Sequence, residues 1–170
     1  MFFKKVVIFL FLFLLCFCCL GAKNDPTFPE ELIWKKDVSK LILVSLDNQC
    51  LATYEYGRLV LCYPISSGRK DRPTPIGKFK IINKEKNGFS AKYKAPMPWT
   101  MAWDGLYALH AGELPGYPDS HGCVRLLLDD AKQLFSWAEI GTEVLIIGFL
   151  GELDSFLKDK APQYGTRALR

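Results

Sequence analysis

A cysteine and two histidines that could carry out nucleophilic chemistry lie close together in the sequence, as His110, His121 and Cys123. The chain has no other histidine, so both imidazoles fall within the 13 residues before Cys123. A thiol near its reference pKa of ~8.5 is mostly protonated at neutral pH, and it needs a base or a positive neighbour to become a thiolate. Histidine titrates in the right range to be that base. The spacing therefore predicts a cysteine nucleophile activated by a histidine.

The local sequence favours His110 as the base. His110 ends a predicted strand over residues 106–110, which would hold its ring rigidly. Cys123 follows a loop rich in glycine and proline and shortly precedes a helix, so we expect it at an accessible corner. The backbone N–H groups of Gly122 and Cys123 could face a developing oxyanion, and Gly122 leaves room for a substrate. We predict that His110 and Cys123 are catalytic and that Gly122 supports them.

Three neighbouring residues have more than one interpretation. His121 could transfer a proton, or it could only orient the loop and the thiol. Ser120 is suited equally to forming the turn and to contacting a substrate. Arg125 could bind a substrate carboxylate, or it could simply pair with Asp129 or Asp130. We predict supporting roles for Ser120 and His121 and a substrate-binding role for Arg125.

Two further interpretations of the same residues need to be weighed. Cys123 could be an inert buried thiol, and His110 could be a hydrogen-bonded core histidine at a strand end. Alternatively, His110, His121 and Cys123 could supply three ligands, the number that a catalytic zinc requires. The chain has no obvious carboxylate at helical spacing to these residues, so we expect no metal and no cofactor.

The elements that must position these residues are mainly β-strands. Apolar or alternating segments predict strands over residues 41–46, 50–55, 58–65, 77–83, 106–110 and 143–147. Tyr56 and Gly57 form the predicted turn of a hairpin. The segment from Lys94 to Trp99 contains two prolines and is expected to be irregular. One helix is expected over residues 130–138 with Asp129 as its N-cap.

The predicted hairpin bears on two of the other cysteines. With a two-residue turn, Cys50 falls opposite Tyr63 and Cys62 falls opposite Leu51. Since side chains alternate along a strand, the two thiols should then point to opposite faces of the sheet, and we expect no disulfide between them.

The chain divides into four parts. Residues 1–22 combine Lys4 and Lys5, an unbroken apolar run and a small-residue end, the pattern of a secretory signal peptide or of an uncleaved N-terminal anchor. Residues 23–38 are expected to be a linker, residues 39–148 the catalytic domain, and residues 149–170 a C-terminal tail. We therefore expect an exported protein of the periplasm or cell envelope, with membrane association through the N-terminus as a further option.

Composition limits the partners. The length of 170 residues suits one domain with a substantial core, and 49% of the residues are hydrophobic. The net charge of +4 is mild and fits an anionic polymer or a membrane surface as a neighbour. No basic stripe with interleaved aromatic residues occurs, so nucleic acid is not an expected partner. The sequence does not predict an oligomeric state.

The segment from Ser120 to Leu126, together with His110-Ala111-Gly112, resembles the active-site signature of the L,D-transpeptidase family, the YkuD-type catalytic domain. The similarity continues upstream in the hairpin around Tyr56-Gly57, in Pro64–Gly68 and in Pro73–Phe79. It covers residues 40–148 approximately. The cysteine-containing motif is the specific part of this resemblance.

The resemblance implies a β-sandwich-like fold with one or two helices and a peptidoglycan stem peptide as substrate. By similarity, Cys123 attacks the carbonyl of the third residue of a tetrapeptide stem, and the terminal D-Ala leaves. An amine of another stem or of a protein then resolves the acyl-enzyme, giving a 3→3 cross-link or an attached protein. His110 matches the proton-transferring histidine. The alternatives are an L,D-carboxypeptidase that trims stems by hydrolysis and a catalytically silent wall-binding protein.

Overall fold

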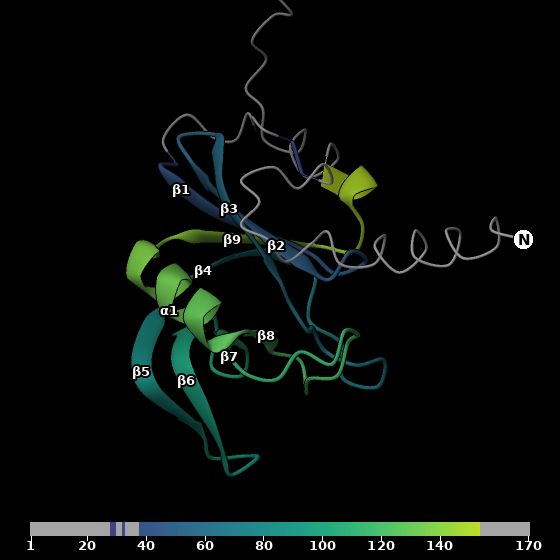
Figure 1. Cartoon of the computed structure of the whole chain (residues 1–170), viewed down its shortest axis with the longest axis vertical. Coiled ribbons are helices and arrows are strands. Elements are labelled where there is room, and N and C mark those ends of the chain that lie inside the picture. The colour runs from purple at the N-terminus through teal and green to yellow at the C-terminus, as the bar shows by residue number, and fades with distance from the viewer. Residues whose placement is uncertain (1–27, 30–31, 33–37, 154–170) are drawn as a thin grey trace, which may run out of the picture.

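The computed structural model describes residues 28–29, 32 and 38–153, and these fold into two β-sheets that form separate layers (Figure 1). The five-stranded sheet has the order β3-β2-β1-β9-β4, and the four-stranded sheet has the order β5-β6-β7-β8. This confirms the mainly β, sandwich-like fold. The strands are β1 (Lys40–Ser45), β2 (Cys50–Glu55), β3 (Arg58–Pro64), β4 (Gly77–Lys80), β5 (Asn83–Ser90), β6 (Ala95–Ala102), β7 (Ala108–Ala111), β8 (Val124–Leu126) and β9 (Glu143–Ile147). The helices are α1 (Leu128–Trp137) and the short 3₁₀ helix η1 (Leu150–Glu152).

The main core lies between the two sheets and α1. On β1, Ile42 and Val44 point into this core, whereas Leu41 and Leu43 point to the opposite face of the sheet. β1 is therefore buried on both faces, which explains why its sequence is an unbroken apolar run rather than an alternating one. It is also the central strand, antiparallel to β2 and parallel to β9.

A second apolar cluster covers the outer face of the five-stranded sheet. Phe28 and Leu32 are only 3% and 4% exposed there, and Leu153 packs on the same cluster. The Tyr54 hydroxyl donates a hydrogen bond to the Pro29 carbonyl, which fixes this segment against β2. Part of the chain before residue 39 therefore packs on the catalytic domain.

The hairpin of β2 and β3 forms where expected, with Glu55 opposite Arg58, but its register differs from the prediction. A β-bulge between Thr53 and Tyr54 shifts the pairing by one residue, so that Ala52 lies opposite Cys62 and Cys50 opposite Pro64. The prediction that the two thiols point to opposite faces was therefore wrong, because both side chains join the outer apolar cluster.

The strand predicted over residues 77–83 is two strands in two different sheets. The Ile81 N–H bonds to Thr142 beside β9, whereas the Ile82 N–H bonds to Ala102 of β6. The chain therefore leaves one sheet and enters the other between these two isoleucines. The alternation of Lys78 to Ile81 ends at the two adjacent isoleucines, but this local break does not show that the hydrogen-bond partner changes from one sheet to the other.

The expectation of an irregular segment over residues 94–99 was wrong, because strand β6 covers most of it. It pairs with β5 along most of its length, but β7 pairs only with Met101 and Ala102. Pro96 and Pro98 therefore lie where one edge of the strand is open, and a missing N–H can face that edge without loss. β5 is polar and mostly exposed, so its sequence gave no strand signal.

Helix α1 begins two residues before the predicted start. Leu127 is the N-cap and provides no side-chain bond, so the expectation of Asp129 as N-cap was wrong. Asp129 instead lies in the first turn, where a negative charge is favourable. At the other end, the Lys84 ammonium from β5 donates to the Phe135 and Ala138 carbonyls, which closes the helix C-terminus. In the described ranges, no helix is long and apolar enough to cross a membrane.

Candidate active site

The parallel pairing of β7 with β8 places His110 and Cys123 on the same side of the sheet. His110 lies opposite Arg125, and their neighbours on either side, Leu109, Ala111, Val124 and Leu126, all belong to the main core. Because side chains alternate along a strand, His110 and Arg125 face away from that core. Cys123 directly precedes β8 and shares the orientation of Arg125. Two residues that are 13 positions apart in sequence thus face the same side, His110 from β7 and Cys123 from the end of the loop before β8.

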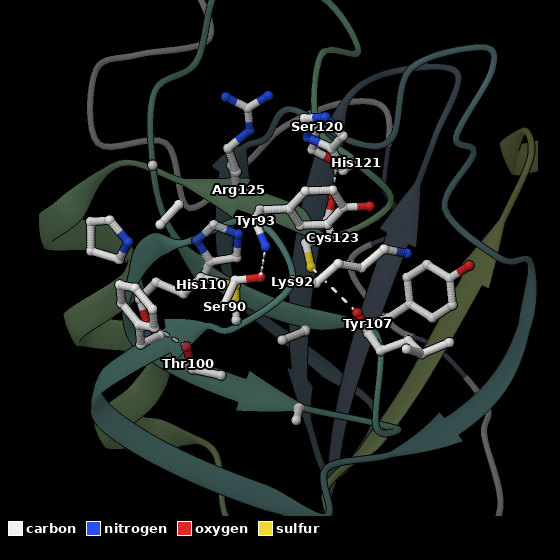
Figure 2. A pocket seen from close by; sticks show the side chains of 18 of the residues that line it. Ser90, Lys92, Tyr93, Thr100, Tyr107, His110, Ser120, His121, Cys123 and Arg125 are labelled. Carbon is white, nitrogen blue, oxygen red and sulfur yellow. Dashed lines mark hydrogen bonds between the residues drawn. The ribbon is translucent and has the colours of Figure 1, made fainter.

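These side chains border a cavity of about 710 Å³. Figure 2 shows the His110 imidazole and the Cys123 sulfur both turned toward this cavity, with Tyr93 and Lys92 at its mouth. The Cys123 thiol is partly buried, and its sulfur lies 4.0 Å from the Leu106 carbonyl oxygen. A cavity of this size, with a nucleophile and a base on its wall, is the usual form of an active site.

The hydrogen bonding of His110 determines which nitrogen can act as a base. Its Nδ1 lies 2.8 Å from the Ala111 carbonyl oxygen, which can only accept, so Nδ1 carries the proton. Burial lowers the pKa of His110, the bond to Ala111 partly opposes this effect, and the charge of Arg125 adds to it. The ring is therefore neutral at physiological pH, and Nε2 is left as a proton acceptor.

The environment of Cys123 favours the protonated thiol in the free enzyme. Burial raises the pKa of the Cys123 thiol, and the negative charge of Asp104 adds to this effect. A backbone hydrogen bond from Ala108 and the charge of Arg125 act in the opposite direction. Together with the lowered pKa of His110, this predicts a neutral thiol beside a neutral imidazole in the resting state.

This protonation state leads to a testable pH dependence. A raised thiol pKa means a smaller thiolate fraction at neutral pH, and the fraction grows as pH rises through that pKa. We expect the rate of Cys123 alkylation by iodoacetamide to rise with pH toward a plateau. The midpoint of this rise should lie above ~8.5, the pKa of an unperturbed cysteine. Peptide mapping at each pH separates Cys123 from Cys50 and Cys62. A rate already at its plateau near neutral pH would instead indicate a thiolate–imidazolium pair.

Ser120 holds the catalytic loop. Its hydroxyl accepts a hydrogen bond of 3.0 Å from the Gly122 N–H and donates to the Cys123 carbonyl. The side chain is buried and only 4% exposed. Of the two roles considered for Ser120, the geometry supports the turn-forming one, since both hydrogen-bonding partners of the hydroxyl belong to the loop.

Position 122 requires a glycine, both for its backbone conformation and because a side chain would not fit there. Its φ is +115°, in the region that L side chains rarely adopt. A Cβ at this position would come within 2.5 Å of the Tyr107 ring, so the ring packs directly against the glycine backbone. The Thr74 hydroxyl holds the Gly122 carbonyl at 2.9 Å. The loop that presents Cys123 is therefore fixed from three directions.

A second segment, Ser66–Arg69, cradles the loop and was not identified from the sequence as part of the site. Ser66 exchanges two backbone hydrogen bonds with Arg125, and the Ser67 carbonyl accepts from the Ser120 N–H. The Arg69 N–H donates to the Ser120 carbonyl. The only sequence signal for this segment was its turn composition and its place in the family resemblance, and neither indicated which loop it would contact.

Arg125 forms an ion pair with Asp119, at 2.7 Å, rather than with Asp129 or Asp130. The arginine stem lies against Gly112, where a Cβ would come within 2.7 Å of Cδ. Arg125 Nε is buried without a hydrogen-bond partner among the described residues. The guanidinium borders the cavity, so it remains able to contact a substrate.

His121 is exposed, in contrast to the buried His110. Its ring contacts the Tyr93 ring with 4.3 Å between the ring centroids and an angle of 33° between the planes. Its pKa is lowered by partial burial and then by the charges of Arg69, Arg72 and Arg125. Among the residues that the structure describes, no three histidine, cysteine or acidic side chains are grouped so as to hold a metal ion. The zinc interpretation therefore has no support from the geometry.

Comparison with known proteins gives a consistent result. Residues 39–146 match the family model of the L,D-transpeptidase catalytic domain. The chain is 35% identical over 133 residues to YkuD of Bacillus licheniformis, covering 74% of this chain and 70% of that protein. It is 31% identical to YbiS of Escherichia coli K12, covering 70% of this chain but only 48% of that protein.

Solved structures agree with the sequence matches. The fold superposes on an L,D-transpeptidase from Stackebrandtia nassauensis with a TM-score of 0.63 and 29% identity, covering 66% of this chain and 57% of that one. The chain thus spans about half the length of some of the proteins it matches. The matched region contains all of the strands that carry the cavity and the full motif around Cys123. The chain therefore belongs to the L,D-transpeptidase catalytic domain family.

Proposed function

We propose that this protein is a peptidoglycan L,D-transpeptidase that works through an acyl-enzyme on Cys123. The observation that carries the proposal is that one cavity is bordered both by the partly buried Cys123 thiol, just before β8, and by the β7 histidine His110, whose Nδ1 is fixed as a donor. In that arrangement Nε2 can accept a proton from a group in the cavity. A histidine with only a structural role in the core would have no reason to border the cavity. The substrate assignment comes from membership of the family.

The proposed reaction has two halves. In the first, His110 Nε2 takes the proton of the Cys123 thiol while the sulfur attacks the carbonyl carbon of the third stem residue. The tetrahedral intermediate collapses, the C–N bond breaks, and the imidazolium returns the proton to the leaving nitrogen of the terminal D-Ala. In the second half, an amine attacks the thioester, His110 accepts its proton, and that proton passes to the departing sulfur. The product is a new amide bond and a free thiol.

The oxyanion site differs from the sequence expectation in one respect. The Gly122 N–H already donates to Ser120, so it is committed to holding the loop. We assign stabilisation of the oxyanion to the Cys123 N–H, with Gly122 acting through its conformation. This arrangement keeps the donor pre-oriented, and pre-orientation is the main source of such stabilisation.

The setting of the reaction follows from the N-terminal sequence. Residues 1–22 have the pattern of an export signal or anchor, and their structure lies outside the described residues. We propose that the protein works in the periplasm or cell envelope, where peptidoglycan is accessible. The acceptor is proposed to be the amine of a second stem, with a protein amine as another acceptor of the same chemistry.

The test is mass spectrometry of the purified protein with a defined tetrapeptide stem, with and without an amine acceptor. We expect a protein mass increased by the acyl tripeptide, release of D-Ala, and a cross-linked dimer once acceptor is supplied. Hydrolysis product without dimer, even with excess acceptor, would mean that the protein is a carboxypeptidase. Binding of the stem without any acyl adduct would mean a silent wall-binding protein.

A further inference from the structure

Three cationic side chains from two separate loops gather at one side of the cavity. Arg69 and Lys92 border the cavity itself, and Arg72 is hydrogen-bonded to Tyr93, which also borders it. We call Arg69, Arg72 and Lys92 the cationic wall. Figure 2 shows Lys92 and Tyr93 at the cavity mouth, in front of Cys123. No catalytic step described above uses any of these three residues.

Tyr93 holds the cationic wall together. Arg72 Nη1 donates a hydrogen bond of 2.8 Å to the Tyr93 hydroxyl. The Lys92 ammonium lies 5.3 Å from the centroid of the same ring, and His121 stacks on the ring. The Arg69 backbone is fixed to Ser120. The wall is therefore attached at several points to the loop that carries Cys123, and it is not a set of freely moving surface charges.

The positive charge of the wall is only partly compensated. In the part of the chain that the structure describes, Asp71 is the carboxylate that pairs with it, at 2.8 Å from Arg69 Nε and 3.8 Å from Arg72 Nε. Three cations and one anion leave a net charge of +2 (3 − 1), and the side chains of Arg69 and Arg72 are 35% and 42% exposed. The lowered pKa of His121, caused by partial burial and by nearby arginines, is consistent with a positive potential here.

Acidic side chains also border the cavity. They are Glu113, Asp104 and Asp119, and the Asp119 carboxylate pairs with Arg125. Fixed charges on a cavity wall orient ligand groups of the opposite sign. The reacting amine of the acceptor is a cation before it loses its proton, so the cationic wall repels that group. The donor reacts at an uncharged peptide carbonyl, and its carboxylates are the groups that a cationic wall attracts.

We propose that the cationic wall is a subsite for a carboxylate of the acyl donor. This inference rests on the proposed function and extends it to the positioning of the donor. Guanidinium groups bind carboxylates through two parallel hydrogen bonds, and an ammonium adds a point charge. The carboxylate has two possible sources in the donor: the terminal residue that is released, and an acidic group within the stem. Both present the same chemistry to the wall.

The experiment measures the first half-reaction alone, without acceptor, by following acyl-enzyme formation with mass spectrometry. Three donors are compared: the free tetrapeptide stem, an analogue with a terminal carboxamide, and an analogue with a side-chain carboxamide. The variants are Arg69→Gln and Lys92→Gln, singly and together. Lys132→Gln is the matched control, because Lys132 is a half-exposed cation that pairs with Asp129 on α1 and does not border the cavity.

We expect the double variant to acylate about tenfold more slowly than the wild type at limiting free donor, with KM raised more than kcat falls. The carboxamide donor that lacks the recognised carboxylate should react equally with both proteins, and this identifies the source. Arg69→Lys should restore part of the rate. Equal rate ratios for all three donors would overturn the inference. Absence of acylation by the wild type would instead refute the proposed function. Lys92 is exposed, so its single variant gives a test even if Arg69→Gln fails to fold.

Discussion

Replacing Cys123 by alanine is expected to abolish acyl transfer, with a loss of at least about 10⁴-fold in kcat/KM. The substitution removes the sulfur that forms the thioester in the proposed mechanism, so neither a stem peptide nor a carbapenem-type acylating agent should add to the protein. The sulfur makes a long contact of 4.0 Å with the Leu106 carbonyl oxygen and accepts a backbone hydrogen bond from Ala108, and neither holds the strands together. The fold should therefore be retained, which thermal unfolding followed by circular dichroism will check.

The other thiols provide the control for this experiment. Cys62 lies on the outer face of the five-stranded sheet, away from the cavity, so Cys62→Ala should still take up one equivalent of the acylating agent. Intact-protein mass spectrometry reads both results. An adduct on the Cys123→Ala protein would place the nucleophile elsewhere, and the proposed mechanism would then be wrong.

The second large effect is expected from comparing the two histidines. In His110→Asn, the side-chain amide can still donate to the Ala111 carbonyl, but nothing replaces Nε2 as a proton acceptor. We expect kcat to fall by about 10²- to 10⁴-fold, the usual contribution of general acid–base catalysis. The residual rate should rise with pH, because the thiolate must then form by ionisation alone.

His121→Asn is the matched control variant, because it makes the same substitution at the second histidine near Cys123. His121 is exposed and stacks on Tyr93, so its loss should change kcat by no more than a few fold. Steady-state kinetics on both variants, with the release of D-Ala as the signal, separates the two roles. A loss for His121→Asn as large as that for His110→Asn would show that proton transfer involves both rings.

Local sequence patterns were sufficient for much of the fold. The apolar runs of β1 and β9 and the turn at Tyr56-Gly57 are encoded by neighbouring residues, so local patterns predict them. The concentration of both histidines just before Cys123 is likewise a local feature. A nucleophilic thiol requires a base nearby to remove its proton. A histidine at the end of a strand, with a short loop between it and the cysteine, places that base close in sequence.

The prediction failed where a residue's conformation depends on a distant partner. Whether Pro96 can sit in a strand depends on which edge of β6 is paired, and this is decided by how far β7 extends. The crossing at Ile81 depends on two different sheets offering hydrogen-bond partners. The bulge at Thr53 that places Cys50 and Cys62 on one face is another such effect.

The proposed chemistry could be predicted from local sequence, since His110 and Cys123 lie in one short segment. The surroundings of these two residues could not, because they depend on the tertiary structure. In the tertiary structure, the Ser120 hydroxyl forms hydrogen bonds within the loop and Arg125 pairs with Asp119. Arg69 and Lys92 border the cavity. Although Ser120 and Asp119 lie close to Cys123 in sequence, their loop is held by Ser66–Arg69, and Arg69 and Lys92 come from segments tens of residues away. These surroundings therefore depend on packing between distant segments rather than on neighbouring residues alone.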